Sequence, residues 1–250
     1  VSSMYNQTFS GCSGLTGEIP TGLFGNISGA PAASMFSGTF FGCSGLTGSI
    51  PSGLFGTFSG APAQYMFQET FQGCSGLTGS IPSNLFSGIS GAVTYNIYDS
   101  TFYGCSGLTG EIPAGLFGNL SGAPVQNIFS YTFSGCSGLT GSIPAGLFGN
   151  LSGAPGYAMF AYTFQGCSGL TGSIPVGLFG NLSNSTATSM FTGTFYNCTG
   201  LTGESALMPD GVTHLYEFFA NPGFTSTSYS GPYTNATGLS DYANIPILWK

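Results

Sequence analysis

Positive charge is almost absent from this sequence. Its 250 residues include one lysine, Lys250, no arginine, one histidine and eight acidic residues, which gives a formal net charge of −7. Neutralising nucleic-acid phosphates or attracting anionic lipids requires several Lys or Arg side chains. We therefore expect no nucleic-acid partner. Charged residues make up only 4% of the chain, so we expect much of its surface to meet other protein or glycan.

Long apolar runs are also missing. Hydrophobic residues reach 42%, but 43 glycines and many hydroxyl residues separate them, and no run approaches the roughly 20 residues that span a bilayer. We therefore predict no membrane span in this chain. A signal-peptide pattern is not visible and the first residue is Val, so we expect a processed or partial chain.

The dominant feature that is present is an internal repeat of 31 residues. Seven units start at residues 4, 35, 66, 97, 128, 159 and 190, and their consensus reads M-F-x-x-T-F-x-G-C-S-G-L-T-G-S-I-P-x-G-L-F-G-N-L-S-G-A-P-x-x-x. Units of this size cannot bury their apolar residues alone, so neighbouring units must stack. The period predicts a repeat solenoid over residues 1–204.

Within each unit, the stretch L-T-G-S-I-P alternates apolar and polar residues, which is typical of a half-buried strand. We expect one short parallel β-strand per repeat in a right-handed, leucine-rich-repeat-like coil, with short helical turns at M-F-x-x-T-F and after the Pro, and a turn at S-G-A-P. One phenylalanine per repeat should form a stacked spine, at Phe9, Phe40, Phe71, Phe102, Phe133, Phe164 and Phe195.

The repeat pattern is lost after about residue 204. Residues 205–250 are aromatic and show no visible repeat. A solenoid must cover the core and the open strand edge of its last repeat. We predict that residues 205–250 form an irregular C-terminal cap, whereas the N-terminal repeat shows no cap pattern.

The repeat words resemble a known family. The motif T-F-x-G-C-S-G-L-T-G-S-I-P is similar to the A-F-x-x-C-x-x-L-x-x-I-x-I-P core of the bacterial BspA-like leucine-rich-repeat surface proteins. The present unit is longer, with a glycine-rich second half. The resemblance covers about residues 4–204 and implies secretion, adhesion or partner binding, and no enzyme activity.

Seven cysteines lie at one position of the repeat, with no C-x-x-C pair or accompanying histidine that would indicate a metal site. We interpret them as a buried, structural thiol ladder, in which seven equivalent thiols cannot all pair. These are Cys12, Cys43, Cys74, Cys105, Cys136, Cys167 and Cys198.

Two further sets of polar residues invite a functional reading. Glu18, Glu111 and Glu204 are three repeats apart, too far to share one cation, and the single histidine, His214, lies near Asp210 and Glu217 in the predicted cap. We interpret both as surface or packing residues. We predict no catalytic residue, no metal and no cofactor, because no acid–base pair, phosphate loop or ligand cluster is present.

The strand pattern directs one threonine per repeat outward, which predicts a hydroxyl ladder of Thr16, Thr47, Thr78, Thr109, Thr140 and Thr171. A regular, uncharged hydroxyl array on a rigid solenoid could bind ice, although outward threonines also follow from strand propensity.

Repeat proteins usually carry specificity where their repeats differ. Exposed aromatics at such positions would serve a protein or sugar interface, or would pack along the convex ridge. The candidates are Phe41, Tyr103 and Tyr196 at one repeat position, and Tyr65, Tyr95 and Tyr157 in the variable tails.

Together these patterns predict a non-enzymatic, extracellular or cell-surface structural protein. The leading hypothesis is self-association into a filament or surface layer, or adhesion, with the chain itself, another surface protein or a glycan as partner. The alternatives are a monomeric protein- or glycan-binding module and an ice-binding solenoid.

Overall fold

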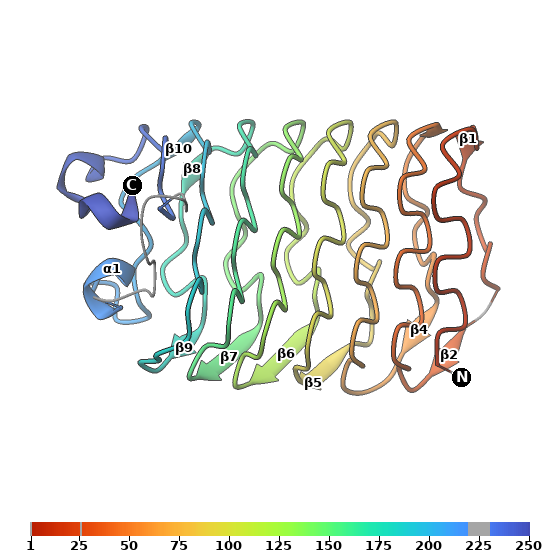
Figure 1. The fold of residues 1–250 in the computed structure, drawn as a ribbon, viewed down its shortest axis with the longest axis horizontal. Coiled ribbons are helices and arrows are strands. Elements are labelled where there is room, and N and C mark those ends of the chain that lie inside the picture. The colour runs from red at the N-terminus through yellow and green to blue at the C-terminus, as the bar shows by residue number, and fades with distance from the viewer. Residues whose placement is uncertain (1, 26, 220–230) are drawn as a thin grey trace.

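The computed structural model describes residues 2–25, 27–219 and 231–250. The chain is a repeat solenoid of parallel β-ladders, with each 31-residue unit forming one rung (Figure 1). The rungs are numbered 1 to 7 from the N-terminus, and they stack side by side along the long axis. No helix in the described part is long and apolar enough to cross a bilayer.

The predicted L-T-G-S strand exists, in a very short form. It appears as parallel pairs of β1 with β3 and of β8 with β10, and between them as single parallel bridges such as Gly110 to Leu139. The bounds are β1 Gly17–Glu18, β3 Leu46–Thr47, β8 Gly172–Ser173 and β10 Leu201–Thr202.

A second parallel ladder lies at the opposite edge of the rungs (Figure 1), where the sequence predicted turns. It contains the longest strands of the protein, in the N-L-S-G words, with order β5-β6-β7-β9. The bounds are β2 Ser28–Gly29, β4 Thr57–Phe58, β5 Ser90–Ala92, β6 Asn119–Gly122, β7 Asn150–Gly153 and β9 Asn181–Leu182. The expectation of one strand per repeat was therefore too low, because each rung has two edges that can pair.

The segment M-F-x-x-T-F does not form the predicted helical turns. We call its stack the turn face, made of residues 3–11, 34–42, 65–73, 96–104, 127–135, 158–166 and 189–197. Alternate amides close local turns, such as Thr101 N to Tyr98 O, or donate to the next rung, such as Ser100 N to Ser130 O at 2.8 Å. Every fourth residue has a positive φ, +54° at both Asn96 and Ser100, which interrupts any helix.

Three columns of aromatic rings fill the core, and one of them is the phenylalanine spine that the sequence predicted. The expected phenylalanine column stacks with centroids 5.4–5.8 Å apart along its length, as in the Phe71–Phe102 pair at 5.7 Å. A second column contains Phe67 and Tyr98, and a third contains Phe86 and adjoins both. Because neighbouring rungs share these contacts, the rungs stabilise one another.

Buried polar groups bind backbone carbonyls of the preceding rung. The Thr101 hydroxyl donates to Phe67 O at 2.9 Å, and the Cys105 thiol donates to Phe71 O at 3.0 Å. The cysteines of rungs 2 to 7 are buried and unbridged, whereas Cys12 in rung 1 is exposed. The predicted thiol ladder therefore has six buried members. Each of these six packs against a preceding rung, and Cys12 has no preceding rung among the described residues.

The C-terminal segment contains a further half rung that was missed in the sequence. Residues 233–240, Y-T-N-A-T-G-L-S, repeat residues 195–202, F-Y-N-C-T-G-L-T, at a spacing of 38 instead of 31. The Tyr233 ring stacks on Phe195 at 5.6 Å, and the Phe195 amide donates to Pro232 O at 2.7 Å. Residues 205–250 are thus not free of repeats.

Short helical segments complete this end of the solenoid: α1 Leu215–Phe218 and the 3-10 turns Tyr242–Asn244 and Ile247–Trp249. Trp249 is 2% exposed and lies against Tyr233 and Phe191. At the other end Met4 and Leu15 are 44% and 40% exposed.

Candidate binding surface

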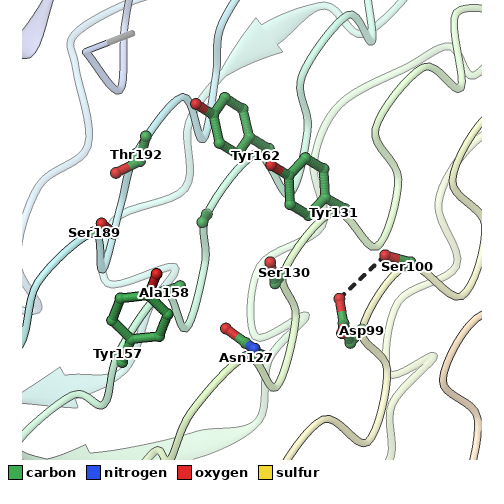
Figure 2. A pocket seen from close by; sticks show the side chains of 11 residues that line it. Asp99, Ser100, Asn127, Ser130, Tyr131, Tyr157, Ala158, Tyr162, Ser189 and Thr192 are labelled. Atoms are coloured by element: carbon green, nitrogen blue, oxygen red, sulfur yellow. Dashed lines mark hydrogen bonds between the residues drawn. The ribbon is translucent and has the colours of Figure 1, made fainter. Parts of the chain in front are cut away.

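A hollow of about 340 Å³ opens on the turn face across rungs 4 to 7. We call it the tyrosine hollow. It arises where the turn residues that vary among repeats lie side by side in successive rungs (Figure 2). Its size is near the lower end of the range for small-molecule sites.

The floor comes from one repeat position, the residue two places after the conserved M of M-F-x-x-T-F. In rungs 4 to 7 this residue is Asp99, Ser130, Ala161 and Thr192. Ser130, Ala161 and Thr192 are small and buried, so three consecutive rungs have little side-chain volume at this position. The hollow follows directly from that run of small residues.

Two tyrosines form a wall of the hollow at the next repeat position. The rings of Tyr131 and Tyr162 stack with centroids 4.8 Å apart and an interplanar angle of 16°. Tyr103 meets Tyr131 edge to face at 5.9 Å. In rung 7 the equivalent residue is Gly193, where a Cβ atom would collide with the Tyr162 ring. The absence of a side chain at Gly193 therefore makes room for the Tyr162 ring.

The other sides of the hollow are lined by aromatic and polar side chains (Figure 2). Tyr157, 50% exposed, lies across from the stacked pair, and the polar side chains of Asn127 and Ser189 come from the turn residues just before the floor. Asn127 and Ser189 have positive φ values of +53° and +60°. The same backbone conformation recurs in each rung, and it brings equivalent side chains into register along the face.

Asp99 supplies the acidic group at one end of the floor. Its carboxylate accepts hydrogen bonds from Gln68 Nε2 at 3.2 Å, Asn96 Nδ2 at 3.1 Å and the Ser100 hydroxyl at 3.1 Å. Burial, with a smaller contribution from the charge of Glu69, raises the pKa of Asp99 to about 6, against the opposing effect of these three donors. The carboxylate is thus largely ionised at neutral pH and titrates in mild acid.

Of the six aromatic residues predicted for an interaction surface, the structure brings two to the hollow. Tyr157 lines it, and Tyr103 contacts its wall through Tyr131. Phe41, Tyr65 and Tyr95 are exposed but are not among its lining residues, and Tyr196 is partly exposed.

Tyr131 and Tyr162 were missed in the sequence. The signal was present, since two successive repeats carry tyrosine at a position that is otherwise occupied by Gln7, Gly38, Glu69, Ser100 and Gly193. Tyrosines at one outward repeat position of successive rungs lie in register, which allows their rings to stack as Tyr131 and Tyr162 do.

The threonine ladder lies on the L-T-G-S edge, away from the residues of the hollow, and all six predicted members are exposed. Glu18, Glu111 and Glu204 are also exposed on this edge. They place charges two residues from the ladder, in rungs 1, 4 and 7.

The cap brings Ser205, His214 and Asp241 together. The Ser205 hydroxyl donates to Asp241 Oδ2 at 2.6 Å and lies 2.9 Å from His214 Nδ1, and that same nitrogen is 3.6 Å from Asp241. A nucleophilic triad needs the histidine to bridge serine and carboxylate through its two different nitrogens. Ser205 is also 1% exposed, so the cluster packs the cap and does not present a nucleophile. The His214 ring stacks on Tyr216 with centroids 4.8 Å apart, and its backbone amide donates to the Glu217 carboxylate at 2.9 Å.

Within residues 2–25, 27–219 and 231–250, no three His, Cys, Asp or Glu side chains lie close enough to hold a metal ion. Comparison of the chain with protein-family models, curated proteins and solved structures finds no match. The resemblance to BspA-like proteins therefore stays a prediction that depends on the repeat words alone.

Proposed function

We propose that this chain is a non-enzymatic adhesion module of an extracellular or cell-surface protein, which contacts its partner with the tyrosine hollow on the turn face. The solenoid supplies a rigid support, and the tyrosine hollow supplies the contact. The observation that carries the proposal is the outward Tyr131–Tyr162 stack, continued by Tyr103, on a surface that has almost no charge.

The energetic argument concerns the aromatic rings. Tyrosines provide large contact areas with little conformational entropy to lose, and they are enriched among the residues that dominate binding energy. Tyr131 and Tyr162 have positive φ values of +54° and +56°, a conformation that glycine adopts at lower cost. Gly38 and Gly193 occupy the same repeat position, so folding alone does not require tyrosine there.

Adhesion can be measured with beads that carry the purified chain. The beads are placed on layers of mucin, of mucin after periodate oxidation of its sugars, and of an unglycosylated protein. We expect retention under flow on at least one layer, and loss of retention with the double variant Tyr131→Ala/Tyr162→Ala. The matched control is Tyr65→Ala/Tyr95→Ala, which removes two exposed tyrosines outside the hollow and should adhere normally. If no layer holds the wild-type beads, or if both variants adhere equally, the proposal is wrong.

Self-association of this 250-residue chain is a second candidate, favoured by an apolar surface at rung 1. An apolar hollow there is lined by Phe9, Leu15, Ile19, Leu23 and other residues. Exposed apolar surface of this kind is a common site of association. Sedimentation velocity at increasing concentration should show association that Leu15→Glu reduces. A wild-type chain that remains monomeric up to millimolar concentration would exclude this candidate.

The ice-binding alternative depends on the exposed threonine ladder. Glutamates beside the ladder interrupt a uniform array, which argues against it. Thermal hysteresis of the purified chain, with Thr109→Lys/Thr140→Lys as the comparison, tests this alternative directly.

A further inference from the structure

We infer that the tyrosine hollow binds a neutral saccharide unit. The inference rests on the proposed adhesive function and gives that function a chemical class of ligand. It depends on four features of the hollow: its ring wall, its polar groups, its charge and its size.

The ring wall suits the apolar face of a pyranose. Aromatic rings carry partial negative charge on their faces, and the C–H groups of a sugar ring carry partial positive charge. Tyr131 and Tyr162 stack on each other, while Tyr157 faces them across the hollow (Figure 2). Because the stacked rings cover one face of each other, a sugar ring would pack on Tyr157, which is 50% exposed, and on the parts of Tyr131 and Tyr162 that line the hollow. Neither contact requires a charge on either partner.

The polar groups suit the hydroxyls of the same ligand. Asn127 offers both a donor and an acceptor, and Ser130 and Ser189 offer hydroxyls around the floor. A carboxylate has about four acceptor positions, and three donors bind Asp99 in the structure, which leaves room for a ligand hydroxyl.

Thr192 gives an independent indication of a ligand. Its side chain is 2% exposed and lines the hollow, and its hydroxyl has no hydrogen-bond partner in the structure. A buried polar group without a partner is costly. A bound hydroxyl compound would supply the missing bond.

The charges exclude acidic sugars. Asp99 is the charged residue that lines the hollow, and the one lysine of the sequence, Lys250, donates to the carbonyls of Tyr242 and Ala243 in the cap. A sialic acid or a phosphorylated sugar would meet a carboxylate and no cation. A quaternary ammonium is less suitable than a neutral sugar, because it has no hydrogen-bonding groups for Asn127, Ser130 and Thr192.

The test is a titration of the isotope-labelled chain, followed by NMR of its tyrosine rings. The probes are glucose, galactose, mannose, N-acetylglucosamine, maltose and cellobiose, with tetramethylammonium and sialic acid as contrasting ligands. We expect at least one neutral saccharide to shift the Tyr131, Tyr157 and Tyr162 signals in a saturable way. Tyr162→Ala should weaken that binding about tenfold, the size of a lost ring contact.

Two variants separate the site from the fold. Ala161→Phe fills the floor of the hollow and should abolish binding. Thermal unfolding of this variant shows whether the solenoid is intact. Tyr162→Ala tests the same site by removing side-chain volume. Tyr95→Ala, outside the hollow, should bind as the wild type does.

Three results would overturn the inference: no saturable shift with any neutral saccharide, unchanged affinity in both hollow variants, or binding of tetramethylammonium or sialic acid in preference to neutral sugars. The adhesion experiment fails separately. Retention on unglycosylated protein that is lost with Tyr131→Ala/Tyr162→Ala would support adhesion while contradicting a saccharide ligand.

Discussion

At the scale of single residues, Tyr98 differs from the equivalent residues of the rungs on either side. It takes the core position that phenylalanine occupies in rungs 2, 3, 5, 6 and 7, at Phe36, Phe67, Phe129, Phe160 and Phe191. Its ring stacks on both neighbours at 5.7 Å, but its hydroxyl is fully buried without a hydrogen-bond partner. Burying an unpaired hydroxyl costs about 1–3 kcal/mol.

We therefore expect Tyr98→Phe to raise the free energy of unfolding by about 1 kcal/mol. Tyr233→Phe is the matched control, because the Tyr233 hydroxyl is equally buried but accepts a hydrogen bond from Ala206 N at 3.1 Å. That variant should lose about 1 kcal/mol. Urea unfolding of the two variants and the wild type measures both values, and a loss of stability in Tyr98→Phe would contradict the prediction.

Asp99 should make the stability of the protein depend on pH in mild acid. Burial raises its pKa to about 6 in the folded state, against an ordinary value near 4. Between these two values the folded chain holds a proton that the unfolded chain has lost. The stabilisation is therefore present below about pH 4 and is lost as the pH rises to about 6.

Asp99→Asn should remove this part of the pH dependence. Glu111→Gln is the control, because it changes the net charge equally at an exposed residue. Urea unfolding at pH 4, 5 and 6.5 should give a smaller fall in stability for Asp99→Asn than for either other protein. Equal falls in all three would show that Asp99 is not the group responsible.

At the scale of the structural element, the contact between rungs demands glycine in the C-S-G-L word. A Cβ atom on Gly107 would lie 2.5 Å from Leu77 O and 2.7 Å from Ser75 O of the preceding rung. Gly14 holds the same repeat position in rung 1, where a Cβ atom would meet nothing within 4 Å. The requirement thus comes from stacking and not from the turn itself.

Gly107→Ala should destabilise the solenoid by about 1–3 kcal/mol, the usual cost of overpacking, whereas Gly14→Ala should change stability by less than about 0.5 kcal/mol. Thermal unfolding followed by circular dichroism compares them. Equal effects of the two substitutions would show that the local turn, and not the contact between rungs, determines the need for glycine at this position.

The elements also show what the sequence could reveal. The stacking of rungs was predictable because Phe40 and its equivalents recur in one register, and burial follows from that recurrence. The second ladder at N-L-S-G was not predictable, because a strand of two to four residues shows almost no alternation of apolar and polar residues. The helical turns predicted for the turn face were wrong because apolar residues at positions i, i+1 and i+5 also fit a helix. The residues with positive φ that prevent a helix include Ser100 and Tyr131, and neither residue type signals this conformation in a sequence.

The tyrosine hollow was only partly predictable for a related reason. Tyr157 and Tyr103 were found as variable aromatics, but the floor depends on small residues such as Ala161, which carry no functional signal by themselves. The half rung at 233–240 escaped notice because its spacing differs from the period, and because Ala236 replaces the marker cysteine.

At the scale of the whole molecule, the first and last rungs of residues 1–250 differ. The C-terminal end is packed by Trp249 and the half rung, whereas rung 1 exposes Leu15 and Cys12. In a stack held together by contacts between neighbours, the end with fewer contacts opens most easily. In the purified 250-residue chain, we expect the rungs to open progressively from rung 1 inward.

The cysteines report this order, one per rung. Buried thiols are inert, and burial raises the pKa of Cys74 and Cys198 to about 12, so iodoacetamide reacts only when a rung opens. Pulse labelling of the native chain, followed by peptide mass spectrometry, should show Cys12 modified at once, then Cys43, with Cys105 and Cys198 much slower. Cys198 is the internal control for Cys43, since each is the buried thiol nearest one end of the stack. A single common rate for all six buried thiols would contradict progressive opening, because it would mean that the seven rungs unfold as one cooperative unit.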